Sequence, residues 1–115
     1  MTYASNKTYH RQLAADNSSY HLLEVDICET KEFSNILEEF RPSGIFHLAA
    51  ESHVDNSIHS SECFVQTNIM GTHSVLQAAK DFTSKVADER SFKFVHVSTD
   101  EVYGSLSKSS SELFK

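Results

Sequence analysis

Hydrophobic and polar positions along the first third of the chain follow helix and strand periods in turn. A short helix is expected around residues 9–15, and a strand that ends in an acid over residues 20–26. In the next segment four apolar residues recur at i, i+3, i+4 and i+7, the spacing of one face of a helix. They are Phe33, Ile36, Leu37 and Phe40. Thr30 is expected to cap this helix, and Pro42 to stop it, with Arg41 pushed out of helical geometry.

The rest of the chain continues this alternation. Residues 44–50 form a short apolar run behind a glycine, which is typical of a strand buried on both faces. A helix is expected over residues 62–82, where Gly71 lowers helix stability unless something packs closely against it. The stretch 93–104 begins as a strand and then changes abruptly to hydroxyls and carboxylates. This order of strands and helices predicts a parallel sheet with right-handed crossovers.

Three of the expected strand ends carry distinctive chemistry. They are Asp26, the small pair Ala49–Ala50, and the run Thr99-Asp100-Glu101. In a parallel sheet the carboxyl ends of the strands lie on one edge, and open α/β sheets bind their ligands at that edge. The sequence therefore predicts that these three groups converge on one site.

The first two of these ends also have plainer interpretations. Asp26 could accept hydrogen bonds from an adenine or a ribose, but taken alone it is better explained as a loop acid or a helix cap. Ala49 and Ala50 would let a flat ring approach the backbone closely, and small residues also occur there simply for packing. Ser52, with the nearby His53 and Asp55, has the composition of a nucleophilic triad, yet residues so close in one loop more often satisfy one another.

Asp100 and Glu101 are an adjacent pair of carboxylates. Such a pair repels, so it can hold one proton near neutral pH, and an acid beside a base is what the elimination of water requires. The alternative for a bare Asp-Glu pair is a solvated acidic turn.

Composition narrows the classes of function. The 115 residues allow one domain, and a net charge of −6 without a basic cluster argues against a nucleic-acid partner. No run has the length of a membrane span or the pattern of a signal peptide, and Cys28 and Cys63 have no redox or metal spacing, so we expect a cytoplasmic protein with reduced thiols and no membrane contact. Seven scattered histidines predict no metal site.

Glycines are too few and too far apart for a phosphate-binding loop. Only Gly44, Gly71 and Gly104 are present, and they form neither G-x-G-x-x-G nor a P-loop. Any nucleotide bound by this chain is bound without such a loop of its own.

Three motifs stand out along the chain: HLAAESHVDNSI at residues 47–58, TNIMGT at 67–72 and STDEVYG at 98–104. Together they closely resemble the dTDP-glucose 4,6-dehydratases, NAD-dependent enzymes of the extended short-chain dehydrogenase/reductase superfamily. The resemblance covers roughly residues 2–106. Related nucleotide-sugar epimerases and decarboxylases share the first motif but usually lack the acid–acid pair, so that pair indicates dehydration.

The resemblance implies a role for each matching position. NAD would be contacted by eight residues: Asp26, Ile27, Leu48, Ala49, Ala50, Glu51, Ser52 and Thr67. Ser52 would also lie near the substrate, and Asn68 would help to fix the active-site architecture. Thr99 would hydrogen-bond the C4 oxygen of the sugar, Asp100 would protonate the departing C6 hydroxyl, and Glu101 would remove the C5 proton.

The resemblance also indicates what this chain does not contain. The expected fold is α/β, an incomplete Rossmann-like parallel sheet flanked by helices, without the first strand and glycine loop of the family. Residues 1–106 would be a partial NAD-binding domain and 107–115 a polar tail. Because two strands of the family's sheet order are missing, we expect that residues 20–26 pair beside residues 44–50, or that the chain is unstable alone.

The expected function is that of a dTDP-glucose 4,6-dehydratase present as a fragment, in which NAD oxidises C4, water is lost and a 4-keto-6-deoxy sugar forms. A nucleotide-sugar substrate, and a homodimer for the full-length enzyme, are implied with it. The isolated fragment is expected to be inactive. The alternatives are a non-catalytic truncated remnant and another NAD-dependent nucleotide-sugar dehydratase or epimerase.

Overall fold

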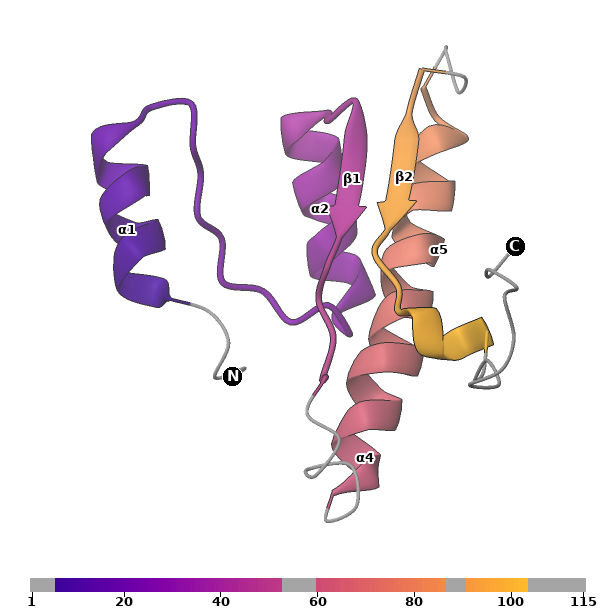
Figure 1. The fold of residues 1–115 in the computed structure, drawn as a ribbon. Coiled ribbons are helices and arrows are strands. Elements are labelled where there is room, and N and C mark those ends of the chain that lie inside the picture. Colours follow the sequence, from indigo (N-terminus) through magenta and orange to yellow (C-terminus); the bar gives the residue numbers. More distant parts are fainter. Residues whose placement is uncertain (1–5, 53–59, 87–90, 104–115) are drawn as a thin grey trace, which may run out of the picture.

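The computed structural model describes residues 6–52, 60–86 and 91–103, and of Asp100 and Glu101 the backbone alone. The elements run in the order α1 (Lys7–Asp16), α2 (Thr30–Phe40), β1 (Gly44–His47), α4 (Ser61–Phe64), the π-helix η1 (Val65–Gly71), α5 (Thr72–Thr83), β2 (Lys93–His96) and the 3₁₀ helix η2 (Asp100–Tyr103) (Figure 1). In this part of the chain, no helix is both long and apolar enough to cross a membrane.

The sheet consists of β1 and β2, which are hydrogen-bonded in parallel with Gly44 opposite Lys93 and His47 opposite His96. Backbone hydrogen bonds extend the ladder at both ends, from Lys93 N–H to the Ser43 carbonyl and from Val97 N–H to the His47 carbonyl. The α/β class and the parallel pairing predicted from the sequence are confirmed.

Helices α2 and α5 pack together and cover one face of this sheet (Figure 1). The core between them is built on Leu37, Ala78 and Phe82, and Ile45 of β1 packs against it. Leu37 belongs to the apolar stripe expected for α2, so the helical period identified the buried face correctly. An ion pair between Lys85 and Glu38 links the end of α5 to α2 at the surface.

The opposite face of the sheet is exposed in the described part of the chain. Phe46 keeps 75% of its surface accessible and Leu48 keeps 65%, and Val95, which pairs with Phe46, is also exposed. The expectation that residues 44–50 are buried on both faces is therefore wrong. The apolar run is present, but within the described ranges only one layer of helices covers it.

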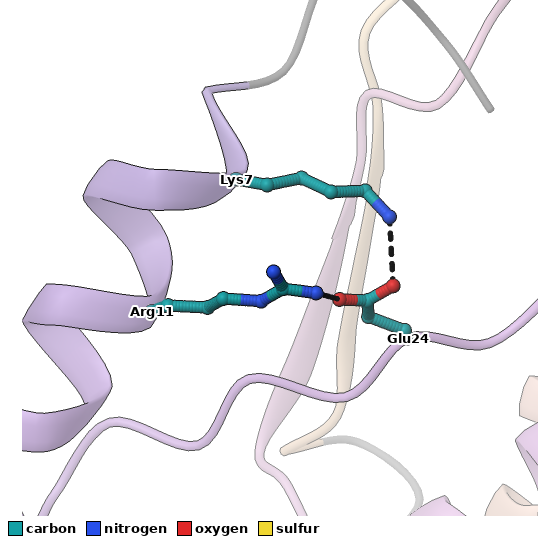
Figure 2. Close-up of polar contacts among 3 residues, drawn as sticks. All are labelled: Lys7, Arg11 and Glu24. Atoms are coloured by element: carbon teal, nitrogen blue, oxygen red, sulfur yellow. Dashed lines mark hydrogen bonds and ion pairs between the residues drawn. The ribbon is translucent and has the colours of Figure 1, made fainter.

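Residues 20–26 form no strand, which corrects a second expectation. The segment is irregular, and together with α1 it stands away from the sheet (Figure 1). Its polar side-chain contacts are with α1, and the ring of His21 lies against Phe40 of α2, with centroids 5.1 Å apart. Glu24 accepts hydrogen bonds from Lys7 at 2.7 Å and from Arg11 at 2.6 Å (Figure 2), and the Tyr20 hydroxyl lies 2.8 Å from His10 Nδ1. A strand needs a neighbouring edge for its backbone groups, and this segment does not lie beside β1, so the expected pairing there is not formed.

The C-terminal end of α2 follows the local rule, whereas its N-terminal end differs from the expected cap. Arg41 adopts the left-handed conformation at φ 44°, and its N–H donates to the Leu37 carbonyl at 3.0 Å, so Pro42 stops the helix as expected. At the other end Glu29 is the cap residue and makes no side-chain capping bond. Thr30 is the first helical residue rather than the cap.

Residues 61–83 form the expected long helix, with a π-helical segment inside it. Gly71, the last residue of that segment, is buried, and a Cβ added there would lie 2.5 Å from Ile27 Cδ1. The close packing required to explain a glycine at this position is present.

Gly44 allows β1 to approach β2, and its replacement tests the ladder. A Cβ at Gly44 would lie 2.6 Å from the Lys93 carbonyl oxygen, a backbone atom that cannot move without separating the strands. We expect Gly44→Ala to lower the free energy of unfolding by about 1–3 kcal/mol in urea denaturation. The matched control is Ser43→Ala at an exposed neighbour, which should change that free energy by less than about 0.5 kcal/mol. Equal stability of Gly44→Ala and wild type would contradict the close approach.

Candidate functional site

A pocket with a volume of about 600 Å³ lies at the carboxyl ends of β1 and β2. The chain that follows β1 contributes Ala49, Ala50, Glu51 and Ser52. The helical wall contributes Phe64, Asn68 and Thr72, and the end of β2 with the chain after it contributes His96, Val97, Ser98 and Thr99. This is the sheet edge at which the sequence predicts a site.

The chain after β1 is held by one side chain of the π-helix. Asn68 Oδ1 accepts a hydrogen bond from the Glu51 N–H at 2.8 Å, and Asn68 Nδ2 donates to the Glu51 carbonyl at 2.9 Å. An amide side chain carries both a donor and an acceptor, so it can satisfy both backbone groups of a residue that has left the sheet. Asn68 therefore fixes the backbone of one pocket wall.

Two histidines lie side by side where the strands end. His47 and His96 are directly opposite each other in the ladder, and their ring centroids are 5.0 Å apart. His47 is 4% exposed, and its Nε2 lies 3.0 Å from the Thr72 hydroxyl oxygen. Burial, followed by the charge of the neighbouring His96, lowers the pKa of His47 below its usual value. A neutral His47 therefore links the end of β1 to the start of α5.

Five of the residues expected at the site lie together around this pocket. They are Ala49, Ala50, Glu51, Ser52 and Thr99. Their side chains are small or hydroxyl-bearing apart from Glu51, which is the one charged group among the described lining residues. The pocket thus combines hydroxyls, an amide and an imidazole, a set of hydrogen-bonding groups that suits a sugar or a ribose.

The other expected cofactor residues lie outside the pocket. Asp26 is exposed, and its Oδ1 accepts a hydrogen bond from the Cys28 N–H at 2.9 Å, so in this structure it behaves as a loop acid. Ile27 packs on Gly71, one residue from Thr72 in the pocket wall. Leu48 and Thr67 are not lining residues, because neighbouring residues of a strand end, or of a helix, point in different directions.

Several predicted groups lie outside the described residues, wholly or in their side chains. Asp100 and Glu101 begin η2 immediately after Thr99, so their backbone follows the pocket wall, while their side chains lie outside the described residues. His53 and Asp55, considered with Ser52 as a triad, also lie outside them.

His96 and Thr72 were not among the residues expected at the site. A signal for them is present in the sequence. His47 and His96 are each the fourth residue of their strands, in Gly-Ile-Phe-His and Lys-Phe-Val-His, so parallel pairing in register makes them neighbours. Thr72 follows Asn68 by four residues, which places both near one helix face.

Comparisons of the sequence with a family model and with curated proteins both identify sugar 4,6-dehydratases as its relatives. A family model described as "GDP-mannose 4,6 dehydratase" matches residues 2–113. A curated dTDP-glucose 4,6-dehydratase of Haemophilus influenzae is 47% identical over 111 residues, which is 95% of this chain and 32% of that relative. Enzymes of the same name from Neisseria meningitidis and Salmonella typhimurium are 45% and 41% identical, each over 92% of this chain and 30% of the relative. The chain thus spans about a third of the length of the curated relatives it matches.

The lowered pKa of His47 predicts how stability depends on pH. His47 binds a proton less readily in the folded protein than in the unfolded chain. Its contribution to the free energy of unfolding is therefore fully present above about pH 6.5 and is lost as the pH falls below that value. We expect the free energy of unfolding to fall between about pH 7.5 and 5.5, and His47→Gln to flatten this dependence. A titration of the His47 ring by NMR, with a midpoint at or above about 6.5, would contradict the assignment.

Proposed function

Because the chain belongs to the GDP-mannose 4,6-dehydratase family, we propose that it carries part of the active site of a nucleotide-sugar 4,6-dehydratase acting on dTDP-glucose. The observation that carries the proposal is the pocket. It lies where β1 and β2 end, Asn68 fixes one wall, and Thr99 in the other directly precedes Asp100 and Glu101.

The residues of the first wall fit part of NAD. Ala49 and Ala50 are exposed beside the pocket and leave room for a flat group against the backbone, and Ser52 offers a hydroxyl. Ala49, Ala50, Glu51 and Ser52 would hold the cofactor here, and Ser52 would also face the sugar. A phosphate cradle is not supplied by the three isolated glycines of this chain, so the pyrophosphate would be held by other polypeptide. When bound, NAD would accept a hydride from the sugar and return it.

The second wall would carry the elimination. Thr99 would hydrogen-bond the C4 oxygen and orient the sugar. Glu101 would take the proton from C5, which a neighbouring ketone makes acidic, and Asp100 would give a proton to the C6 hydroxyl as it leaves as water. Both proton transfers need a carboxyl group within reach of the sugar, and Asp100 and Glu101 directly follow Thr99, which lines the pocket.

A second candidate is a non-catalytic remnant that binds other subunits. One observation favours it: in the described part of the chain, one face of the sheet is exposed, with Phe46, Leu48 and Val95 on it. We expect the isolated chain to form no product from dTDP-glucose and NAD. Turnover by the isolated chain would exclude this second candidate. For a full-length enzyme we further propose a homodimer.

The catalytic roles can be tested in a chimera. In it, residues 2–113 of this chain replace the aligned segment of the Haemophilus influenzae relative. We expect a folded chimera, verified by circular dichroism, to convert dTDP-glucose to the 4-keto-6-deoxy product. Glu101→Gln in this chimera should still reduce NAD on addition of substrate. Its rate of product formation should fall by a factor of about 100 or more, because the base is lost.

The matched control is Glu39→Gln, an exposed carboxylate of α2, which should leave the product rate unchanged. Product formation by Glu101→Gln at the rate of the parent chimera would refute the role of Glu101. A folded chimera that neither reduces NAD nor forms product would refute the proposed function of the segment.

A further inference from the structure

The π-helix η1 and the first turn of α5 contact two separate parts of the chain. On one side they contact Ile27 and Cys28. Ile27 packs so closely on Gly71 that a Cβ there would lie 2.5 Å from Ile27 Cδ1 and 2.7 Å from Cγ1. The Cys28 thiol donates to the Gln66 carbonyl at 3.4 Å, and the Ser74 hydroxyl donates to the Cys28 carbonyl at 3.4 Å.

On the other side the same helical segment holds the pocket. Asn68 bonds both backbone groups of Glu51, and Thr72 lies within hydrogen-bond distance of His47. Asn68 and Thr72 flank Gly71 in sequence. The helix at Gly71 therefore cannot move relative to Ile27 without moving the side chains that hold the end of β1.

A π-helix makes this position adjustable. Its hydrogen bonds run from i to i+5, it is rare, and it is less regular than the α-helix on either side. Its own backbone therefore sets the position of Asn68 less firmly than an α-helix would. A contact from outside the segment can therefore help to hold Asn68 opposite Glu51, and Ile27 supplies one by packing against Gly71.

We propose that Ile27 is a positioning residue of the pocket: by packing against Gly71 it sets the place of the π-helix and, through Asn68, the backbone of Glu51. The identity of the ligand rests on the proposed function, but the coupling itself does not, and its test uses the chain without ligand. If Ile27 only fills space, its effect should spread over the whole fold and not appear first at Glu51.

The test is a double-mutant cycle read by amide hydrogen exchange in the full chain. Glu51 N–H reports the Asn68 contact, and Val97 N–H, bonded to the His47 carbonyl, reports the neighbouring ladder. In Gly71→Ala the new methyl group displaces Ile27, so Glu51 exchange should accelerate about tenfold or more relative to Val97.

Ile27→Ala removes both atoms that meet this methyl, and alone it should also accelerate Glu51 exchange by loosening the helix. In the double variant the methyl occupies the vacated space, so the ratio of the two exchange rates should return to within about threefold of wild type. Ile27→Val, which removes the Cδ1 atom alone, provides a milder variant that keeps the test valid if Gly71→Ala does not fold, with an expected acceleration of about twofold or more.

The matched control is Ala78→Gly, on α5 in the core with Leu37 and Phe82 and away from Ile27. It weakens the same helix, so it should accelerate exchange at Glu51 and Val97 by similar factors. Three results would overturn the proposal: equal acceleration of both amides in the Ile27 variants, unchanged Glu51 exchange in them, or no rescue in the double variant.

Discussion

The pairing of β1 with β2 is the interaction on which the pocket depends. The register places His47 beside His96 and makes both strands end at the same level, so the chain leaving β1 and the chain leaving β2 form facing walls. A slip of one residue would turn every strand side chain to the other face. It would remove the His47–Thr72 contact and turn Ile45 away from the core, so the register of four residue pairs is fixed by packing on one face.

The polar contacts near the pocket differ in what they stabilise. Asn68 and Thr72 each join a helix to the end of β1, over 17 and 25 residues of sequence, and both contacts are partly buried. The ion pairs of Glu24 with Lys7 and Arg11 are exposed and hold only α1 to the segment that follows it (Figure 2). Exposed pairs contribute little to stability, whereas hydrogen bonds in a less polar setting fix geometry. The pocket is thus positioned by a few internal bonds rather than by surface charge.

The elements that the sequence predicted well are those whose signal is local. The apolar stripe around Leu37, the stop at Pro42 and the contact required by Gly71 each depend on residues within a turn or on one missing Cβ. Residues 20–26 have the composition of a strand, but a strand also requires an edge to pair with, which composition does not encode. Phe46 illustrates the same limit: its apolar character is visible in the sequence, but whether a second layer covers it is not. In the site, Ala49 to Ser52 and Thr99 were found because strand ends converge, while His96 and Thr72 required the register.

The exposed sheet face runs along β1 and β2, whereas the pocket lies beyond their carboxyl ends. Side chains alternate between faces, so Phe46 and Leu48 point away from the helices while His47 points toward Thr72. His47, which joins the end of β1 to Thr72 of the pocket wall, therefore lies on the side that the core supports, through Ile45 and the packing of α2 on α5. Covering the exposed face would add stability to the strands without changing the contacts of Asn68 or Thr72. The geometry of the pocket is thus set by the layer of α2 and α5, whereas the stability of the two strands also depends on what covers their other face.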